Sequence, residues 1–511
     1  MARRLVILPI LLFIAIPAFA QLVDTMWVRR YNGPGNGDDW TSAIAVDNSG
    51  NVYVAGANFA TETDDDYATI KYDPSGKELW VRTYNGPGNG WDWVYDMTVD
   101  NAGNVCVTGR SWGDTTSYDY ATIKYDSDGN ELWVQRYNGP GNDLDWATSI
   151  GVDTYGNVYV TGSSWSNETE WDYTTIKYDS NGDTLWIRRY DGYTSRWDLA
   201  SDIFVDGSFH VYATGQSDST GTGDYATVKY DEDGNQLWAA VYNGPGGIYD
   251  AACGVAVDDF GNVYVTGDSY GGETNEDYGT IKYYPNGDTA WIRRYDGPAK
   301  YDFPHAIAVD ASGNVYVTGQ SYGISWDYLT VKYDSSGNEI WTKRFNGARN
   351  WVDVARAITV DSSGNVYVTG YGAISHDRYF DYATIKYDHL GNELWLQRYN
   401  GTGNGNDEAR SMAVDGSGNV YVTGRSFGHG TGYDCATIKY LQAYALRGDV
   451  DADGLLTITD IAHLIDYLFK DGPAPNPILP VADVNCDRIV DLVDAVYLIN
   501  YLLKGGPPPC Q

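Results

Sequence analysis

The segment DYATIKYDSDGNELWVQRYNGPGND, residues 119–143, recurs with small changes along most of the 511-residue chain. Its LWV tryptophan and its opening aspartate each recur eight times. The related motif VYVTG recurs every 51 to 54 residues, with its first valine at Val52, Val105, Val158, Val211, Val263, Val315, Val366 and Val420. A fixed period of this size indicates a repeat architecture, which decides the fold before any single element is assigned.

Each unit contains four short runs rich in Val, Ile, Thr, Tyr and Trp, separated by Gly, Asn and Asp. Examples are SAIAVD (42–47), NVYVTG (157–162), DYATIKYD (119–126) and LWVQRYN (132–138). Such runs with such turns predict a four-stranded antiparallel meander. Four strands in about 50 residues is the size of a propeller blade. The sequence therefore predicts an all-β, eight-bladed β-propeller.

The order of the runs predicts how the ring closes. The repeats begin with a fourth run, residues 27–32, and end with a third run, residues 434–440. The N-terminal run should therefore complete the last unit, which leaves no lone blade edge. Seven blades with one displaced unit are the lesser alternative.

The motifs DxxGNVYVTG and DYATIKYDxxGNELW resemble the seven-bladed β-propeller repeat family over residues 27–440. The family's name states seven blades, whereas this chain supplies eight complete units. The resemblance implies a propeller fold and no defined activity.

The two ends of the chain differ from the repeats. Arg3, Arg4, the apolar run 5–16 and the segment 18–20 (AFA) predict a signal peptide over residues 1–20. We expect the propeller over 21–444, a separate domain over 445–511, no membrane span and a secreted or cell-surface protein. The formal charge of -35 makes nucleic acid an improbable partner.

Ten tryptophans fall in or beside the long loops that connect the runs. Exposed aromatic rings in loops favour ligand binding, so a glycan or protein ligand is expected there. The alternative is that the rings fill space between loops and blades. The ten are Trp40, Trp91, Trp93, Trp112, Trp146, Trp165, Trp171, Trp197, Trp326 and Trp351.

Two other repeated positions carry charge. One aspartate stands at the end of each long loop that precedes a first run. These aspartates either form a ring that binds a cation or accept hydrogen bonds from the backbone of their own turns, and the second interpretation is favoured. A lysine in every third run is expected to be paired, with nearby aspartates as available partners. The aspartates are Asp39, Asp92, Asp145, Asp198, Asp250, Asp302, Asp353 and Asp407.

A catalytic constellation is not identifiable in the sequence. The six histidines are scattered, and neither a Ser/His/Asp set nor a glycosidase-like carboxylate pair stands out. The segment DxxGxELW also looks like the tryptophan-docking segment of pyrroloquinoline-quinone dehydrogenases, but the adjacent cysteines typical of those enzymes are missing. An extracellular enzyme acting on polysaccharide at the tryptophan-rich face stays the alternative function.

The tail contains two loops rich in oxygen ligands. The first loop lies in residues 448–460, GDVDADGLLTITD, and its position 1 is Asp449. Carboxylates then stand at positions 1, 3, 5 and 12 and Gly454 at position 6, the spacing that folds around Ca²⁺. A second loop follows 34 residues later with Arg488 at its sixth position. The expected ligands are Asp449, Asp451, Asp453, Leu455, Thr457 and Asp460, then Asp483, Asn485, Asp487, Ile489, Asp491 and Asp494.

Each loop leads into a short amphipathic helix, with apolar residues at Ile461, Leu464, Ile465 and Leu468, and again from Ala495. The duplicated loop and helix resemble a type I dockerin over about residues 448–504. The resemblance implies calcium-dependent docking to a cohesin-like module. It assigns partner contact to loop positions 10 and 11, which are Ile458, Thr459, Leu492 and Val493.

We therefore expect an exported, non-enzymatic binding or scaffold propeller, attached to a partner through a calcium-dependent dockerin-like domain. Cys486 and Cys510 lie in this domain and could form a disulfide.

Overall fold

The computed structural model describes residues 22–193, 196–218, 221–299, 301–347, 350–373, 379–443, 448, 450, 456–470, 472, 482–485, 489–504, 506–507 and 509. The chain divides into two compact units, one spanning Thr25–Leu441 and one that contains the residues from Gln442 onward. Each unit is described by itself.

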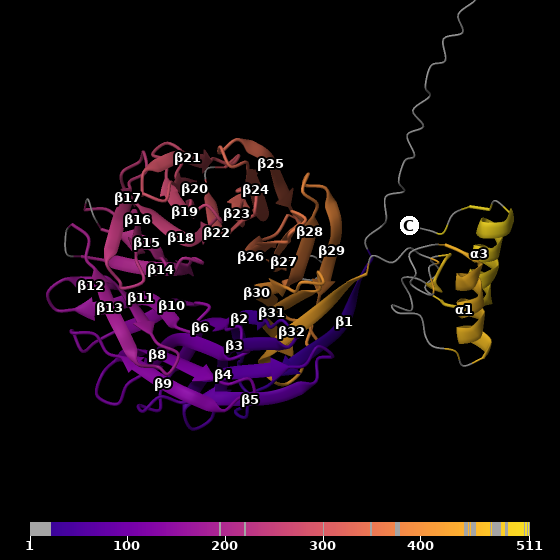
Figure 1. Ribbon diagram of the computed structural model, residues 1–511, viewed down its shortest axis with the longest axis horizontal. Helices are drawn as coiled ribbons and strands as arrows, with labels where there is room; N and C mark the ends of the chain where they lie inside the picture. Colours follow the sequence, from indigo (N-terminus) through magenta and orange to yellow (C-terminus); the bar gives the residue numbers. More distant parts are fainter. Residues whose placement is uncertain are drawn as a thin grey trace, which may run out of the picture. The chain divides into compact units, whose positions relative to one another are not determined.

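The first unit is a ring of eight four-stranded antiparallel sheets (Figure 1). Blade 1 is β2 (Trp40–Val46), β3 (Val52–Ala60), β4 (Asp64–Tyr72) and β5 (Glu78–Tyr84). Blade 2 is β6 (Asp92–Val99), β7 (Val105–Trp112), β8 (Tyr118–Tyr125) and β9 (Glu131–Tyr137). Blade 3 is β10 (Asp145–Val152), β11 (Val158–Ser166), β12 (Glu170–Tyr178) and β13 (Thr184–Tyr190). Blade 4 is β14 (Asp198–Val205), β15 (Val211–Ser217), β16 (Asp224–Tyr230) and β17 (Gln236–Tyr242).

The remaining blades repeat this order. Blade 5 is β18 (Asp250–Val257), β19 (Val263–Tyr270), β20 (Glu276–Tyr283) and β21 (Thr289–Tyr295). Blade 6 is β22 (Asp302–Val309), β23 (Val315–Tyr322), β24 (Trp326–Tyr333) and β25 (Glu339–Phe345). Blade 7 is β26 (Asp353–Val360), β27 (Val366–Gly372), β28 (Asp381–Tyr387) and β29 (Glu393–Tyr399). Blade 8 is β30 (Asp407–Val414), β31 (Val420–Gly428), β32 (Gly432–Ala443) and β1 (Leu22–Tyr31).

Blade 8 closes the ring as the sequence predicts. Its strands lie in the order β1-β32-β31-β30, so the N-terminal strand completes the sheet of the last repeat (Figure 1). The Arg30 guanidinium bonds the Asp434 carboxylate at 2.8 Å, across 404 residues of sequence. The prediction of eight blades is confirmed, and the alternative of a displaced unit is wrong.

The first strand of every blade lies on the inside of the ring (Figure 1). Each of these strands carries a one-residue bulge against the second strand, such as Tyr95 between the paired residues Val94 and Asp96. A bulge leaves the extra residue out of the ladder and redirects its side chain. The eight bulge residues are Ser42, Tyr95, Thr148, Ser201, Cys253, His305, Arg356 and Arg410.

The hydrophobic core lies between neighbouring blades. One buried cluster joins Tyr53, Tyr67 and Trp80 of blade 1 to Val107 and Ile123 of blade 2, and similar clusters occur around the ring. Each blade therefore buries its faces against its two neighbours, as expected for a repeat that is not stable alone.

A tryptophan of the fourth strand bonds a turn of the next blade in seven of the eight blades; the exception is Trp395 of blade 7, whose indole nitrogen has no partner within the described residues. The Trp80 indole Nε1 donates to the Ser127 carbonyl at 3.2 Å, and its ring lies against Gly129 of the same turn. Gly129 has a φ of 81°, which favours glycine. A Cβ at Gly129 would lie 2.7 Å from a Trp80 ring carbon. Glycine is therefore required at this position both by the backbone conformation of the turn and by the packed Trp80 ring.

We expect Gly129→Ala to lower the free energy of unfolding by more than 1–2 kcal/mol, roughly the penalty of the left-handed conformation alone, because the Trp80 ring must also move. Gly207→Ala is the control, since a Cβ there would meet nothing within 4 Å. Urea unfolding monitored by tryptophan fluorescence measures both. Equal stability of the two variants would contradict the role of this contact.

The lysines of the third strands, from Lys71 to Lys439, are buried, and their direct contacts differ from our expectation. The Lys71 Nζ donates to the Ser127 carbonyl of the next blade at 2.7 Å, and Lys282 similarly bonds the Ser335 carbonyl. Among the contacts described, a lysine–aspartate ion pair is formed by Lys124 with Asp100, at 3.2 Å. The direct hydrogen bonds of these lysines therefore go mainly to carbonyl oxygens of the neighbouring blade's turn. Aspartates at the ends of the first strands act on them through their charge: burial lowers the pKa of Lys229 and of Lys282, and the charges of Asp206 and Asp258 oppose that shift.

In the part of the second unit that the structure describes lie two helices, α1 (Ile458–Phe469) and α3 (Leu492–Lys504), as the apolar periodicity predicts. Their inward residues form two small clusters, one around Leu464 and Ala495 and one around Ile461 and Leu498. Within the described residues, no helix is both long enough and apolar enough to span a membrane. Cys486 and Cys510 lie outside the described residues.

Candidate functional site

The last acidic residue of the first tail loop holds that loop to its helix. The Asp460 side chain is fully buried; its Oδ1 accepts the Val450 N–H at 2.6 Å and its Oδ2 accepts the Thr457 N–H at 2.8 Å. Thr457 is the N-cap of α1 and its hydroxyl accepts the Thr459 N–H, which completes a capping box. One carboxylate thus closes the loop and starts the helix.

The second loop repeats this geometry 34 residues later. The Asp494 Oδ1 accepts the Val484 N–H at 2.7 Å, and its Oδ2 accepts the Asp491 N–H at 2.9 Å. Burial raises the pKa of Asp494, and the nearby charge of Asp483, itself 5% exposed, acts in the same direction. Two carboxylates are therefore held close together with little solvent, an arrangement that a cation stabilises.

Several expected ligands are placed and others are not. Thr457, Asp460, Asp483, Asn485, Ile489, Asp491 and Asp494 are described in the structure. Asp449, Asp451, Asp453, Leu455 and Asp487 lie outside the described residues.

The expected partner-contact residues are all on the surface. Ile458 is 64% exposed, Leu492 55% and Val493 53%, and Thr459 is also exposed. Sequence reasoning missed Val496 and Leu503 of α3 and Phe469 of α1, three further large apolar side chains that are exposed. Val496 and Leu503 stand four and eleven residues after Leu492 in α3, and Phe469 stands eleven residues after Ile458 in α1, so each shares a face of its own helix with an expected contact residue; this spacing could have found them.

None of the ten loop tryptophans is fully buried. Trp91, Trp112, Trp197 and Trp351 are exposed, and the other six are partly buried. Several contact one another: Trp91 and Trp93 stack with ring centroids 6.2 Å apart, and the tilted rings of Trp146 and Trp171 have centroids 4.3 Å apart. The tryptophans therefore both pack together and present surface.

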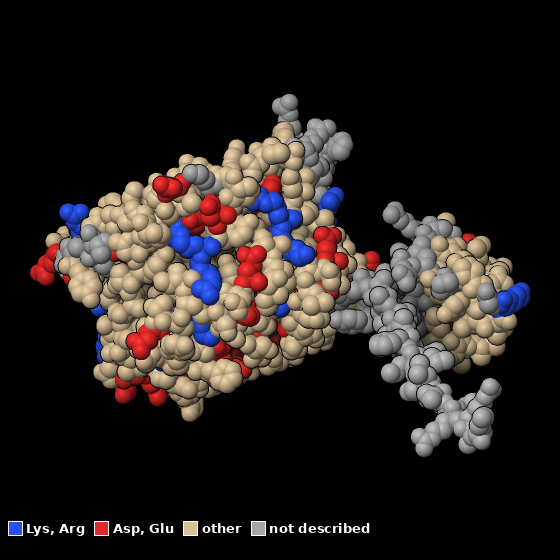
Figure 2. All heavy atoms as spheres, turned by 90° about the horizontal axis from the view of Figure 1, so that it is seen from above, with Lys and Arg blue, Asp and Glu red and all other residues tan. Residues whose placement is uncertain are grey.

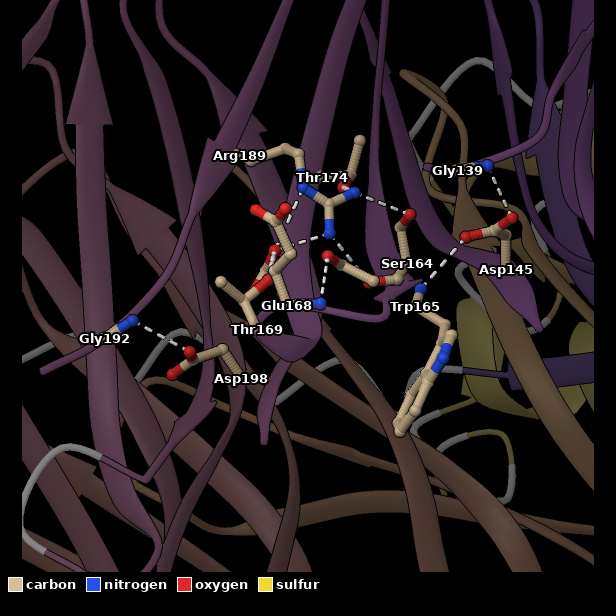
Figure 3. Close-up of polar contacts among 12 residues, drawn as sticks. Gly139, Asp145, Ser164, Trp165, Glu168, Thr169, Thr174, Arg189, Gly192 and Asp198 are labelled. Atoms are coloured by element: carbon tan, nitrogen blue, oxygen red, sulfur yellow. Dashed lines mark hydrogen bonds and ion pairs between the residues drawn. The ribbon is translucent and has the colours of Figure 1, made fainter. Parts of the chain in front are cut away.

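The repeated aspartates that end the long loops serve their own turns. The Asp145 Oδ2 accepts the Gly139 N–H at 2.7 Å and its Oδ1 accepts the Trp165 N–H at 3.1 Å (Figure 3). The Asp198 Oδ2 likewise accepts the Gly192 N–H at 2.8 Å. Each of the eight is at most 1% exposed, so the structural interpretation fits them better than a cation ring.

The aspartate that opens the third strand pairs with an arginine of the fourth strand. In blade 3 the Arg189 guanidinium contacts the Asp172 carboxylate, the Ser164 hydroxyl at 2.8 Å and the Thr174 hydroxyl at 3.3 Å (Figure 3). Asp172 also belongs to a carboxylate cluster with Asp191 and Asp198, and Arg189 already neutralises it. Equivalent pairs are Arg30–Asp434, Arg136–Asp119, Arg294–Asp277 and Arg344–Asp327.

Opposite charges are interspersed over the side of the propeller that Figure 2 shows, where red and blue side chains lie beside one another. The large negative charge is thus not gathered into one field on that visible face.

The buried aspartates make stability depend on pH. Burial raises the pKa of Asp39, Asp145 and Asp198 to about 6 and that of Asp353 to about 7. A raised pKa means that the folded protein binds more protons than the unfolded chain between pH 3.8 and about 7, so this contribution to stability is lost as the pH rises through that window.

We therefore expect the unfolding midpoint to be higher at pH 5 than at pH 8, and to fall again below about pH 4. The fall at low pH follows from turn aspartates such as Asp310. Burial disfavours its charge, but hydrogen bonds from Asn314 outweigh burial and lower its pKa. Thermal unfolding by circular dichroism across pH 3–9 checks this, and a midpoint that rises steadily to pH 8 would contradict it.

Family comparisons agree with the two units. The beta-propeller repeat model matches residues 27–57, 132–168, 249–275, 290–324, 340–375 and 395–429, and the dockerin type I domain model matches residues 447–503. The chain thus carries six recognised propeller repeats within an eight-bladed ring, followed by a dockerin type I domain.

Similarity to individual proteins is distant. An uncharacterized WD repeat-containing protein, L264 of Acanthamoeba polyphaga mimivirus, is 25% identical over 76% of this chain, which spans 29% of that relative's length. The Sqt1 structure from Chaetomium thermophilum matches 83% of this chain and 100% of its own at 10% identity, with a TM-score of 0.49. The XC5397 gluconolactonase of Xanthomonas campestris matches 55% and 90% at 14% identity, with a TM-score of 0.28. These two scores support no functional argument.

Proposed function

We propose that this protein is an exported, non-enzymatic binding or scaffold propeller, attached to a cohesin-like partner or a cell-surface assembly by a calcium-dependent dockerin domain. The observation that carries the proposal is the duplicated loop and helix, in which Asp460 and Asp494 make the same pair of backbone bonds. Residues 1–20 act as the signal peptide, residues 21–444 form the propeller and residues 445–511 the docking domain.

The donor set fits calcium. In the second loop, Asp483 and Asp494 are buried carboxylates, and the described hydrogen bonds of Asp494 all come from backbone N–H groups. Hard Ca²⁺ takes six to eight oxygens, and it would supply the positive charge that holds these carboxylates together. Asp449, Asp451, Asp453, Leu455, Thr457 and Asp460 would hold one ion; Asp483, Asn485, Asp487, Ile489, Asp491 and Asp494 would hold the other.

The docking surface consists of exposed apolar side chains at the starts of the two helices. Leu492 and Val493 offer more apolar surface than the equivalent pair Ile458 and Thr459, since threonine replaces valine. The two halves are therefore unequal, and the α3 half, which Val496 extends, makes the stronger contact.

Calorimetric titration of the full chain against a panel of cohesin modules, in calcium and in EDTA, tests this function. We expect binding in the presence of calcium and none in EDTA. The variant Leu492→Asp with Val493→Asp should weaken binding more than Ile458→Asp with Thr459→Asp. Binding that persists in EDTA, or that neither variant affects, would refute the proposed docking mode.

The propeller itself presents the tryptophan-rich loops to a glycan or protein ligand. Trp91 and Trp112 are the exposed members of a group in which Trp93 stacks on Trp91. Glycan and peptide arrays probed with the protein, and with Trp91→Ala and Trp112→Ala, test this surface. Unchanged array binding by both variants would remove it.

A second candidate is an extracellular enzyme acting on polysaccharide at this loop face. Asp268 and Glu276 of blade 5 favour it: burial raises the pKa of Asp268 to about 7, the charge of Glu276 adds to the shift, and a carboxyl group with this pKa suits a general acid. Loss of polysaccharide hydrolysis in Asp268→Asn would support the enzyme. Absence of hydrolysis by the wild-type protein on a broad panel would remove it.

A further inference from the structure

A group of basic side chains lies on the inner strands of three consecutive blades. His305 of β22, Arg356 of β26 and Arg410 of β30 are the bulge residues of blades 6, 7 and 8. Strand β26 packs against both β22 and β30 on the inside of the ring (Figure 1). We call these three residues, with Arg425 of β31, the basic arc.

The basic arc is specific to one part of the ring. At the same bulge position, blades 1 to 4 carry Ser42, Tyr95, Thr148 and Ser201, which have no positive charge. The chain as a whole has a formal charge of -35. The local charge of these three arginines is therefore opposite in sign to the net charge of the protein.

The positive charges of the arc act on one another. Burial lowers the pKa of Arg410, and the charges of Arg425 and Arg356 lower it further. Burial also lowers the pKa of His305 to about 3, with Arg356 acting in the same direction, so His305 is neutral at physiological pH. The charge of Arg356 thus influences both of its neighbours in the arc.

Few negative groups oppose these charges. Glu408 bonds Arg425 at 2.6 Å and Arg410 at 3.5 Å, and the charge of Asp38 also influences Arg425. The described contacts of Arg356 are with the neutral Tyr371, whose hydroxyl lies 3.2 Å from its Nη2. Within the described residues, three arginines thus face one carboxylate directly.

Two buried nitrogen atoms in the arc lack a hydrogen-bond partner within the described residues, His305 Nε2 and Arg425 Nε. A buried nitrogen without a partner is unfavourable unless a ligand or water satisfies it. The arc is also accessible, since the Arg410 side chain is 41% exposed and that of Arg425 30%.

We propose that the basic arc is an anion-binding site that takes a carboxylate or sulfate group at the inner strands of blades 6 to 8. The planar guanidinium groups of Arg356 and Arg410 match the paired oxygens of such a group. This site is independent of the calcium loops and of the proposed docking function.

Calorimetric titration of the full chain in a chloride-free buffer tests the site, with sodium sulfate, sodium glucuronate and glucose as probes. We expect saturable binding of the first two and none of glucose. Equal binding of sulfate and glucuronate would show that the oxyanion suffices, and tighter glucuronate binding would show that the sugar ring also contributes. Absence of binding by both anions would overturn the proposal.

Arg356→Gln and Arg410→Gln should each weaken binding by about tenfold or more, since a hydrogen bond to a charged group is lost. Arg196→Gln is the matched control, because it removes the same charge from an exposed side chain outside the arc, in the loop before β14. Variants that bind as tightly as the control would overturn the assignment.

A measurement on the wild-type protein does not depend on how the arginine variants fold. The His305 pKa, followed by NMR and assigned with His305→Gln, should rise when sulfate saturates the protein, because the anion offsets the charge of Arg356. Sulfate binding that leaves the His305 resonance and its pKa unchanged would place the anion elsewhere and overturn the proposal.

Discussion

Removal of residues 22–31 will prevent the propeller from closing. These residues form β1, whose loss exposes the edge of β32 in blade 8. Asp434, 5% exposed, would lose the guanidinium of Arg30, and a buried charge without its partner costs about 3–5 kcal/mol. The buried ring of Trp27 would be lost too, at roughly 3–5 kcal/mol. The sum rivals the whole stability of many domains.

Chemical unfolding and analytical ultracentrifugation of the truncated protein measure this effect. We expect the truncated protein to unfold at a lower denaturant concentration and to self-associate through the open edge of β32. The variant Arg30→Ala isolates the ion pair. Arg189→Ala is its matched control, because Arg189 makes the equivalent contact with Asp172 in blade 3, whose four strands are consecutive in the chain. A truncated protein that stays monomeric with an unchanged unfolding midpoint would contradict closure by β1.

Loss of the twelfth-position aspartates will unfold the docking domain. Asp460→Ala or Asp494→Ala removes a calcium ligand of the proposed set, and it also removes the acceptor of one buried and one partly buried backbone N–H group. Each single variant should keep one of two calcium sites, and the double variant should lose the helical circular dichroism of α1 and α3. Short helices of this kind depend on the ions and on each other.

Calcium titration of the full chain by calorimetry, with circular dichroism before and after EDTA, checks this prediction. Asp466→Ala is the control, because Asp466 lies on the same helix in an exposed ion pair with Lys470. Two calcium sites of unchanged affinity in Asp460→Ala, or full helicity in EDTA, would show that these carboxylates do not hold metal.

The sequence was most informative where the pattern repeats. The eightfold recurrence of the LWV and VYVTG motifs determined the number of blades, and the position of the first run before the first full unit determined that β1 closes blade 8. The apolar periodicity that starts at Ile461 and again at Ala495 predicted the two helices of the tail. Each of these features can be predicted from the sequence because it depends only on the period of a motif, the order of the runs or the spacing of residues along the chain.

The tertiary structure decided how side chains meet between blades. The sequence shows a lysine in each third strand, but not that Lys71 would bond the Ser127 carbonyl of the next blade. It likewise shows Arg30 and Asp434 without showing that they meet. These contacts depend on blade twist and on the height at which each turn meets its neighbour, which no run of residues encodes by itself.

The basic arc shows the same division. His305, Arg356 and Arg410 are separated by about one repeat and carry no shared motif, so their charges looked unrelated in the sequence. Each lies at the bulge of an inner strand, and packing of β26 against β22 and β30 brings the three close enough for the charge of Arg356 to act on His305 and Arg410. The sequence by itself determined the blades, their number and the two-helix tail. Only the packed ring decided which charges are neighbours, because proximity across blades follows from three-dimensional register and not from chain order.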